Sequence, residues 1–120
     1  MIEVFVRGMP YVKHKVRGRV EGAKEWSVAV KAQTGNLGSM SGPCRLDVEF
    51  VLPAGSFPTD HPCGPDLDNL LKRLLDGLND TVLREAPGGD GAVVKLNARK
   101  RKAGAGEPTG ARIILSQARF

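Results

Sequence analysis

The sequence of 120 residues has few of the residues that support several common protein classes. Its two cysteines, Cys44 and Cys63, are too few for a disulfide framework or a zinc ribbon. With four Phe, one Trp and one Tyr, it has too few aromatic rings for a protein that stacks single-stranded bases. No apolar run approaches the length of a membrane span, and residues 1–4 do not resemble a signal peptide. We therefore expect one cytoplasmic domain over residues 1–120, with free thiols and no membrane contact.

The net charge of +5 is distributed unevenly along the chain. Residues 60–90 hold seven acidic and three basic side chains, whereas the rest of the chain holds six acidic and fifteen basic ones. An acidic centre between basic flanks is typical of an enzyme that holds a cation and binds a polyanion, although basic runs also occur as plain solvated surface. We predict DNA-backbone contacts from six basic residues: Lys13, Lys15, Arg17, Arg19, Arg99 and Lys100.

Hydrophobic periodicity predicts a single domain that alternates strands and helices. Strict alternation of apolar and polar residues predicts strands, and apolar residues three and four positions apart predict helices. Trp26 is expected in the core of the first helix. The fold class that we expect is α+β: a two-layer sandwich of a mixed β-sheet with two helices on one face. The predicted elements, in β-α-β-α-β-β order, are strands at 2–7, 45–52, 92–99 and 111–116, helices at 23–34 and 68–78, and a flexible hairpin tip at 101–110.

The second helix begins with an unusual group of polar residues. Its leucines recur at helical spacing, and a polar stripe of alternating charge follows Asp68 at every fourth residue. The preceding Gly-Pro favours extended backbone before the helix, so Asp66 and Asp68 lie on one side and converge at the helix start. Lys72 then lies one turn further along. A helix cap needs one acid, whereas two acids and a lysine at this spacing indicate a magnesium and phosphate site.

Residues 61–100 resemble the signature of the RusA-type Holliday-junction resolvases, which are small phage-derived endodeoxyribonucleases. The family pattern is roughly H-x-x-K-P-D-L-D-N-L-x-K-x-x-x-D-x-L, followed by D-D-x-x-V-V and a later basic residue. The chain departs from it at Gly64, where lysine is usual, and at residues 89–90, where Gly-Asp replaces the acidic pair after a longer connection. The matching residues are His61, P-D-L-D-N-L at 65–70, Lys72, Asp76, Leu78, Asp90 and V-V at 93–94.

The resemblance implies a mechanism and a partner. It implies that Asp66, Asp68 and Asp90 bind Mg²⁺, for which Mn²⁺ substitutes, with Asp90 beside the start of the second helix and Lys72 acting on the phosphate. It also implies a homodimer that nicks two opposed strands of a four-way DNA junction, in a bacterium or encoded by its phage. Two alternatives remain open: a magnesium-dependent nuclease for flaps or other branched DNA, and a DNA-binding module without catalysis.

Overall fold

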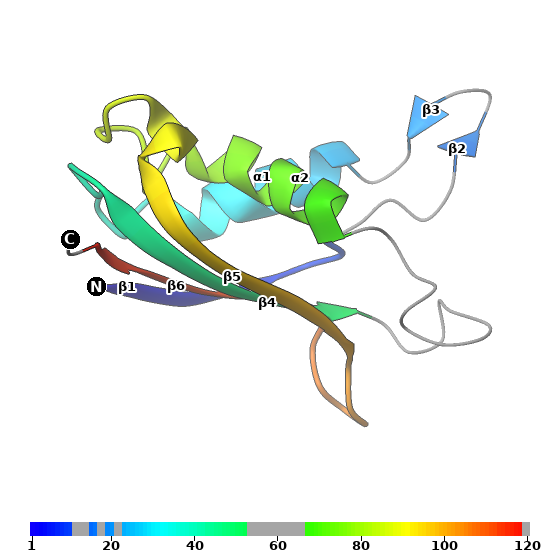
Figure 1. Ribbon diagram of the computed structural model, residues 1–120. Coiled ribbons are helices and arrows are strands. Elements are labelled where there is room, and N and C mark those ends of the chain that lie inside the picture. Colours follow the sequence, from blue (N-terminus) through cyan, green and yellow to red (C-terminus); the bar gives the residue numbers. More distant parts are fainter. Residues whose placement is uncertain (11–14, 17–18, 21–22, 53–66, 119–120) are drawn as a thin grey trace.

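Figure 1 shows the computed structural model of the chain, which describes residues 1–10, 15–16, 19–20, 23–52 and 67–118. The predicted order of the long elements is confirmed. The structure adds a short strand pair before the first helix, and a 3₁₀ helix between the second helix and the next strand. The elements are β1 (Ile2–Arg7), β2 (Lys15–Val16), β3 (Arg19–Val20), α1 (Ala23–Thr34), β4 (Cys44–Leu52), α2 (Leu67–Leu78), η3 (Gly89–Ala92), β5 (Val93–Lys102) and β6 (Gly110–Gln117).

The four long strands form one mixed sheet in the order β1-β6-β4-β5. Strand β6 pairs antiparallel with β1 and β4, whereas β5 pairs parallel with β4. Parallel neighbours need a crossover connection, and α2 lies in the connection between β4 and β5. Because this crossover returns along the sheet, α2 runs opposite to both strands (Figure 1). The expected α+β fold with a mixed sheet is confirmed.

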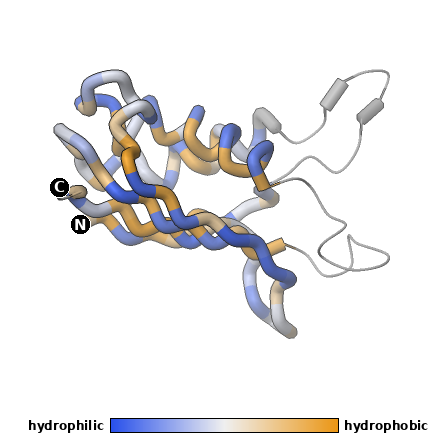
Figure 2. Tube along the Cα trace, in the orientation of Figure 1, coloured by the Kyte–Doolittle hydropathy of each residue, from blue (hydrophilic) through white to orange (hydrophobic). Residues whose placement is uncertain are grey.

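Strand β4 shows why the sheet has one covered face. Leu46, Val48 and Phe50 are buried, while Asp47 and Glu49 between them point to the opposite, partly exposed face. Both helices lie on one side of the sheet (Figure 1), and hydrophobic residues alternate with hydrophilic ones along the elements of both layers (Figure 2). The core therefore lies between the sheet and the helix pair, as the alternation predicted.

The two helices pack side by side and run parallel. Gly77 of α2 lies against Val30 of α1. Further along, the buried hydroxyls of Thr34 and Thr81 are 2.7 Å apart and form a hydrogen bond. Residue numbers rise together in the two contacts, so both helices begin at the same end of the molecule. Trp26 is buried in the first turn and a half of α1, as predicted for a core residue.

The connection between β5 and β6 is shorter than the sequence suggested. Arg101 and Lys102, which we assigned to a hairpin tip, belong to β5. The Arg101 guanidinium donates two hydrogen bonds of 2.6 Å to the Glu107 carboxylate, and its Nε donates a third, of 3.0 Å, to Glu49. Hydrogen bonding to Arg101 lowers the pKa of Glu107 to about 2, helped by the Gly104 backbone N–H. The predicted hairpin is wrong, because β4 lies between β5 and β6 in the sheet and the connection passes from one side of β4 to the other. The ion pair of Arg101 with Glu107 and Glu49 holds this β5–β6 connection against β4.

Candidate functional site at the start of α2

Helix α2 begins at Leu67, one residue before the predicted start. Asp68 lies in its first turn, is exposed, and accepts a hydrogen bond of 3.0 Å from the backbone N–H of Asn69. A carboxylate in the first turn interacts favourably with the positive end of the helix dipole. Asp66 lies outside the described residues, so its predicted convergence with Asp68 stays a prediction.

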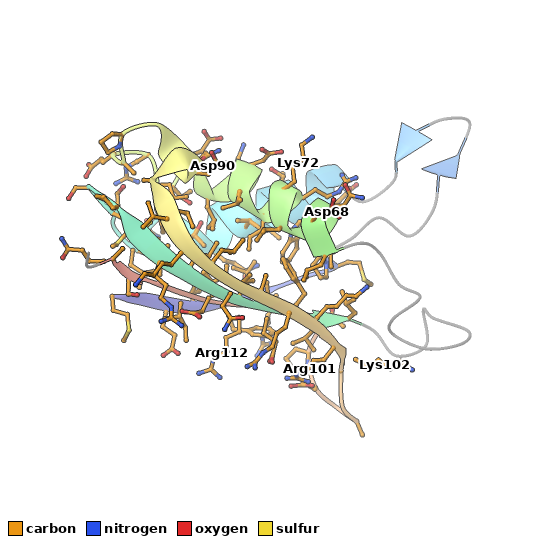
Figure 3. The ribbon with its side chains drawn as sticks, in the orientation of Figure 1. Asp68, Lys72, Asp90, Arg101, Lys102 and Arg112 are labelled. Atoms are coloured by element: carbon orange, nitrogen blue, oxygen red, sulfur yellow. The ribbon has the colours of Figure 1, made fainter. Side chains whose placement is uncertain are left out.

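The polar stripe of α2 is confirmed. Asp68, Lys72, Asp76 and Asp80 are all exposed, while the helix buries leucines on its opposite side. Asp80, at the far end, forms an ion pair of 2.9 Å with Lys31 of α1. Lys72 lies one turn from Asp68, a rise of about 6 Å along the axis. The beginning of the helix therefore presents one exposed acidic residue, Asp68, and one exposed basic residue, Lys72, a turn apart (Figure 3).

Asp90 does not lie beside the start of α2, and that prediction is wrong. It belongs to η3, and the preceding Gly89 lies so close to Asn79 that a Cβ atom there would be 2.9 Å from Asn79 Oδ1. Asn79 follows the last residue of α2, so roughly 16 Å of helix separates it from Asp68. The crossover explains this placement, because the chain leaves α2 at the end where β5 begins. Figure 3 shows Asp90 and Asp68 at opposite ends of the helix.

The predicted magnesium ligands fit only in part within one chain. Asp68 supplies an exposed carboxylate, the hard oxygen donor that Mg²⁺ prefers. Asp90 is too far away to share an ion with it. Within the described ranges, no group of three His, Cys, Asp or Glu side chains is placed to hold a metal ion. One chain therefore brings Asp68 and Lys72 together but does not add Asp90 to them.

Two residues of the first group of predicted DNA contacts belong to the β2–β3 strand pair. Lys15 belongs to β2 and Arg19 to β3, and the two strands pair antiparallel. Lys13 and Arg17 lie outside the described residues. The hairpin precedes α1 by two residues, and α1 begins at the same end of the molecule as α2. Figure 1 accordingly shows β2 and β3 beyond the end at which α2 begins.

The second predicted group is divided between the two faces of β5. Arg99 is next to Glu49 in the sheet register, and its Nε lies 2.7 Å from a Glu49 carboxylate oxygen on the open face. Lys100 is next to Phe50 and therefore belongs to the face that the helices cover. Lys102, next to Leu52, lies on that same face. The period of two along β5 was the signal that relates Lys102 to Lys100.

A hollow lies on the open face of the sheet. Asp47 and Glu49 line it together with Arg99 and Arg112. Both acids are already paired with arginines, since Arg45 lies 3.0 Å from Asp47 and Arg99 lies 2.7 Å from Glu49. Carboxylates neutralised in this way are poor candidates for metal ligands, so the hollow is better explained as part of a surface ion-pair network.

Cys44 is a buried core residue and not part of a reactive site. It is buried at the start of β4, and its Sγ donates a long hydrogen bond of 3.7 Å to the Ala92 carbonyl oxygen. Burial raises the pKa of the thiol, so the thiolate that would bind metal or act as a nucleophile is disfavoured. The expectation of a free thiol is confirmed for Cys44, and Cys63 lies outside the described residues.

Neither the protein-family models nor the curated proteins include a match to this chain. No helix in the described part of the chain is long and apolar enough to cross a membrane.

Proposed function

We propose that the chain is a magnesium-dependent endodeoxyribonuclease that resolves four-way DNA junctions by paired nicks, as the resemblance to RusA-type resolvases implies. The observation that carries the proposal is the start of α2, where the exposed Asp68 is followed one turn later by the exposed Lys72. Asp66 precedes this helix in the sequence. A helix start needs only one acid, so a second one supports a site for a cation.

Asp66 and Asp68 would hold Mg²⁺, and Mn²⁺ would substitute for it. Carboxylates suit both ions because they are hard oxygen donors that leave coordination positions for water and phosphate. When bound, such an ion makes water acidic enough to attack phosphorus and neutralises charge on the leaving oxygen. The clustered carboxylates would repel one another without a cation, which favours its binding.

Lys72 would act on the scissile phosphate. Its ammonium group is carried by the same rigid helix as Asp68, about 6 Å further along the axis. A cation fixed there stabilises the negative charge that develops on the phosphate oxygens during attack. The basic β2–β3 hairpin, at the same end of the molecule, would contact the DNA backbone by charge. We place the enzyme in the cytoplasm of a bacterium, encoded by the host or by a phage.

A comparison of DNA substrates tests this function. We expect a synthetic four-way junction to be nicked on two opposed strands in Mg²⁺ or Mn²⁺ and to stay intact in EDTA. A replication flap and a plain duplex should be cut far more slowly. Equal cleavage of flap and junction would instead support a general branched-DNA nuclease. Junction binding without cleavage in any metal would support a DNA-binding module.

A matched pair of variants tests the site. Asp68→Asn should abolish cleavage while junction binding is kept or slightly strengthened, because the change removes a metal ligand and a negative charge. Asp76→Asn removes the same charge from the same stripe two turns further along the helix and should cleave nearly as fast as the wild type. Full activity of Asp68→Asn, or full activity in EDTA, would overturn the metal site.

A further inference from the structure

Arg73, in the second turn of α2, is a partly buried arginine whose guanidinium has no anionic partner in the described part of the chain. Two other arginines of the described ranges, Arg7 and Arg84, also have no acid partner, but both are exposed. A guanidinium that loses water without gaining an anion is unfavourable, so Arg73 favours an anion from outside the chain. Four arginines do pair with carboxylates, at 2.6 to 3.0 Å: Arg45, Arg99, Arg101 and Arg112.

Arg73 lies on the side of α2 that faces α1. It precedes Gly77, which touches Val30 of α1, by one turn, a rotation of about 40° around the helix. Because the helices run parallel, Arg73 lies level with Trp26, one turn before Val30. Lys72 is about 140° from Gly77 and belongs to the outer stripe. The two basic side chains therefore leave α2 in directions about 100° apart.

The side chains of the second turn of α2 are directed back toward the first turn, because the Cα–Cβ bonds of a helix tilt toward its N-terminus. The Arg73 side chain is therefore directed toward the end of the molecule at which the proposed site lies. Helix α1, which flanks it, begins two residues after β3, so the β2–β3 strand pair lies beyond the same end (Figure 1). Four basic residues thus gather at this end: Lys15, Arg19, Lys72 and Arg73.

We propose that Arg73 binds the DNA phosphate next to the one on which Lys72 acts, and so holds the scissile strand in position. This assignment rests on the proposed nuclease function. A guanidinium fork donates two parallel N–H bonds to phosphate oxygens, which fixes the orientation of the strand as well as supplying charge. Because Lys72 and Arg73 diverge, successive phosphates of one strand match them better than a single phosphate does.

A DNA strand fits this flank better than a carboxylate of a partner protein. Basic residues lie on both sides of Arg73, since Lys72 is on the outer stripe and the β2–β3 strand pair lies beyond α1. One Asp or Glu side chain would neutralise one of these charges, whereas a DNA backbone carries a charge at every nucleotide. In the described part of α2, Asp76 forms no ion pair with Arg73, so its own helix does not neutralise the guanidinium.

Neutral phosphate replacements test the contact directly. Synthetic four-way junctions each carry one methylphosphonate near the crossover, and binding is measured in EDTA, where we expect no cleavage. One replacement, next to the nicked phosphate, should weaken wild-type binding by roughly 10- to 100-fold, the usual cost of a lost hydrogen bond to a charged group. The same replacement should have no further effect in Arg73→Met. It should have the wild-type effect in Arg84→Met, the control, because Arg84 is exposed and follows the far end of α2.

Methionine keeps most of the apolar stem of arginine, so Arg73→Met removes the charge and retains the packing. This variant should lower the salt slope of binding to the unmodified junction by about 0.9. Arg73→Lys should restore the slope but not the full affinity, because it keeps the charge and lacks the fork. Wild-type affinity and slope in Arg73→Met, or an undiminished loss at every methylphosphonate in that variant, would overturn the proposal.

The outcomes separate this contact from the nuclease function. If the wild-type chain cuts no DNA in any metal but one methylphosphonate is coupled to Arg73, the nuclease function fails and the phosphate contact is confirmed. If the junction is cut and Arg73→Met binds it like the wild type, the contact is overturned and the nuclease function is unaffected.

Discussion

Gly77 of α2 lies directly against Val30 of α1: a Cβ atom built on the glycine would come within 2.7 Å of Val30 Cγ1. Val30 is fully buried and β-branched, so it has little freedom to move aside. Gly77→Ala should therefore destabilise the fold by about 1–3 kcal/mol through overpacking. This loss would exceed the gain of roughly 1 kcal/mol that alanine brings to a helix interior.

Urea denaturation monitored by circular dichroism measures this effect. Gly42→Ala is the control, because nothing lies within 4 Å of the position that its Cβ would take. We expect the control to stay within about 0.5 kcal/mol of the wild type. Equal or greater stability of Gly77→Ala would mean that the helices do not approach as closely as described.

Glu107 gives the β5–β6 connection a stability that depends on pH. Its pKa is lowered from 4.5 to about 2 by the hydrogen bonds from Arg101 and from the Gly104 backbone N–H. A lowered pKa in the folded state means that the contribution is fully present above the unfolded value and is lost as pH falls through the folded one. Glu107→Gln should therefore lower the urea midpoint at neutral pH, and the difference from wild type should shrink between pH 4.5 and pH 2.

The control for this experiment is Glu85→Gln, which removes an exposed carboxylate from the connection between α2 and η3. Its difference from the wild type should be small and nearly constant over the same range. A Glu107→Gln difference that does not change with pH would show that Arg101 holds the β5–β6 connection without help from the carboxylate charge.

Much of this fold is predictable from local patterns in the sequence. The helix at residues 23–34 has the predicted bounds, and the alternation around Phe50 identifies the buried face of β4. The leucines of α2 predict its buried side, and the polar stripe from Asp68 to Asp80 is exposed as expected. These features depend on neighbours within a turn or a strand, which is the range over which periodicity carries information.

The main prediction that failed, the position of Asp90, depends on the order and direction of the strands in the sheet. The position of Asp90 follows from a parallel crossover between β4 and β5, and no local pattern reports which strands are neighbours or in which direction they run. The separation of Arg99 from Lys100 is a local effect, because successive side chains of a strand point to opposite faces; it was missed because the predicted strand ended at residue 99, whereas β5 continues to Lys102. The exposure of Leu96 is also invisible in the sequence, because an edge strand and a central strand can share the same alternation.

Lys72 should contribute to the chemical step more than to binding. If it stabilises charge on the phosphate, Lys72→Ala should slow single-turnover cleavage of a saturated junction by roughly 10²–10³-fold with little change in affinity. Lys31→Ala is the control, because it removes another exposed lysine, whose ion pair with Asp80 is on the surface and contributes little. A wild-type rate for Lys72→Ala at saturation would show that Lys72 has no role in the chemical step.

The basic β2–β3 hairpin should contribute to binding more than to chemistry. Each phosphate contact that is lost should reduce the slope of log binding constant against log salt concentration by about 0.9, because fewer counterions are released. Lys15→Ala/Arg17→Ala should therefore weaken junction binding and flatten the slope by about 2, while single-turnover cleavage at saturating protein stays near the wild-type rate. Arg45→Ala, which removes a basic residue paired with Asp47 on the open face of the sheet, should leave the slope unchanged. Salt titrations of both variants on one junction decide the matter: a flatter slope for Arg45→Ala alone would move the DNA from the helix-start end to the open face of the sheet.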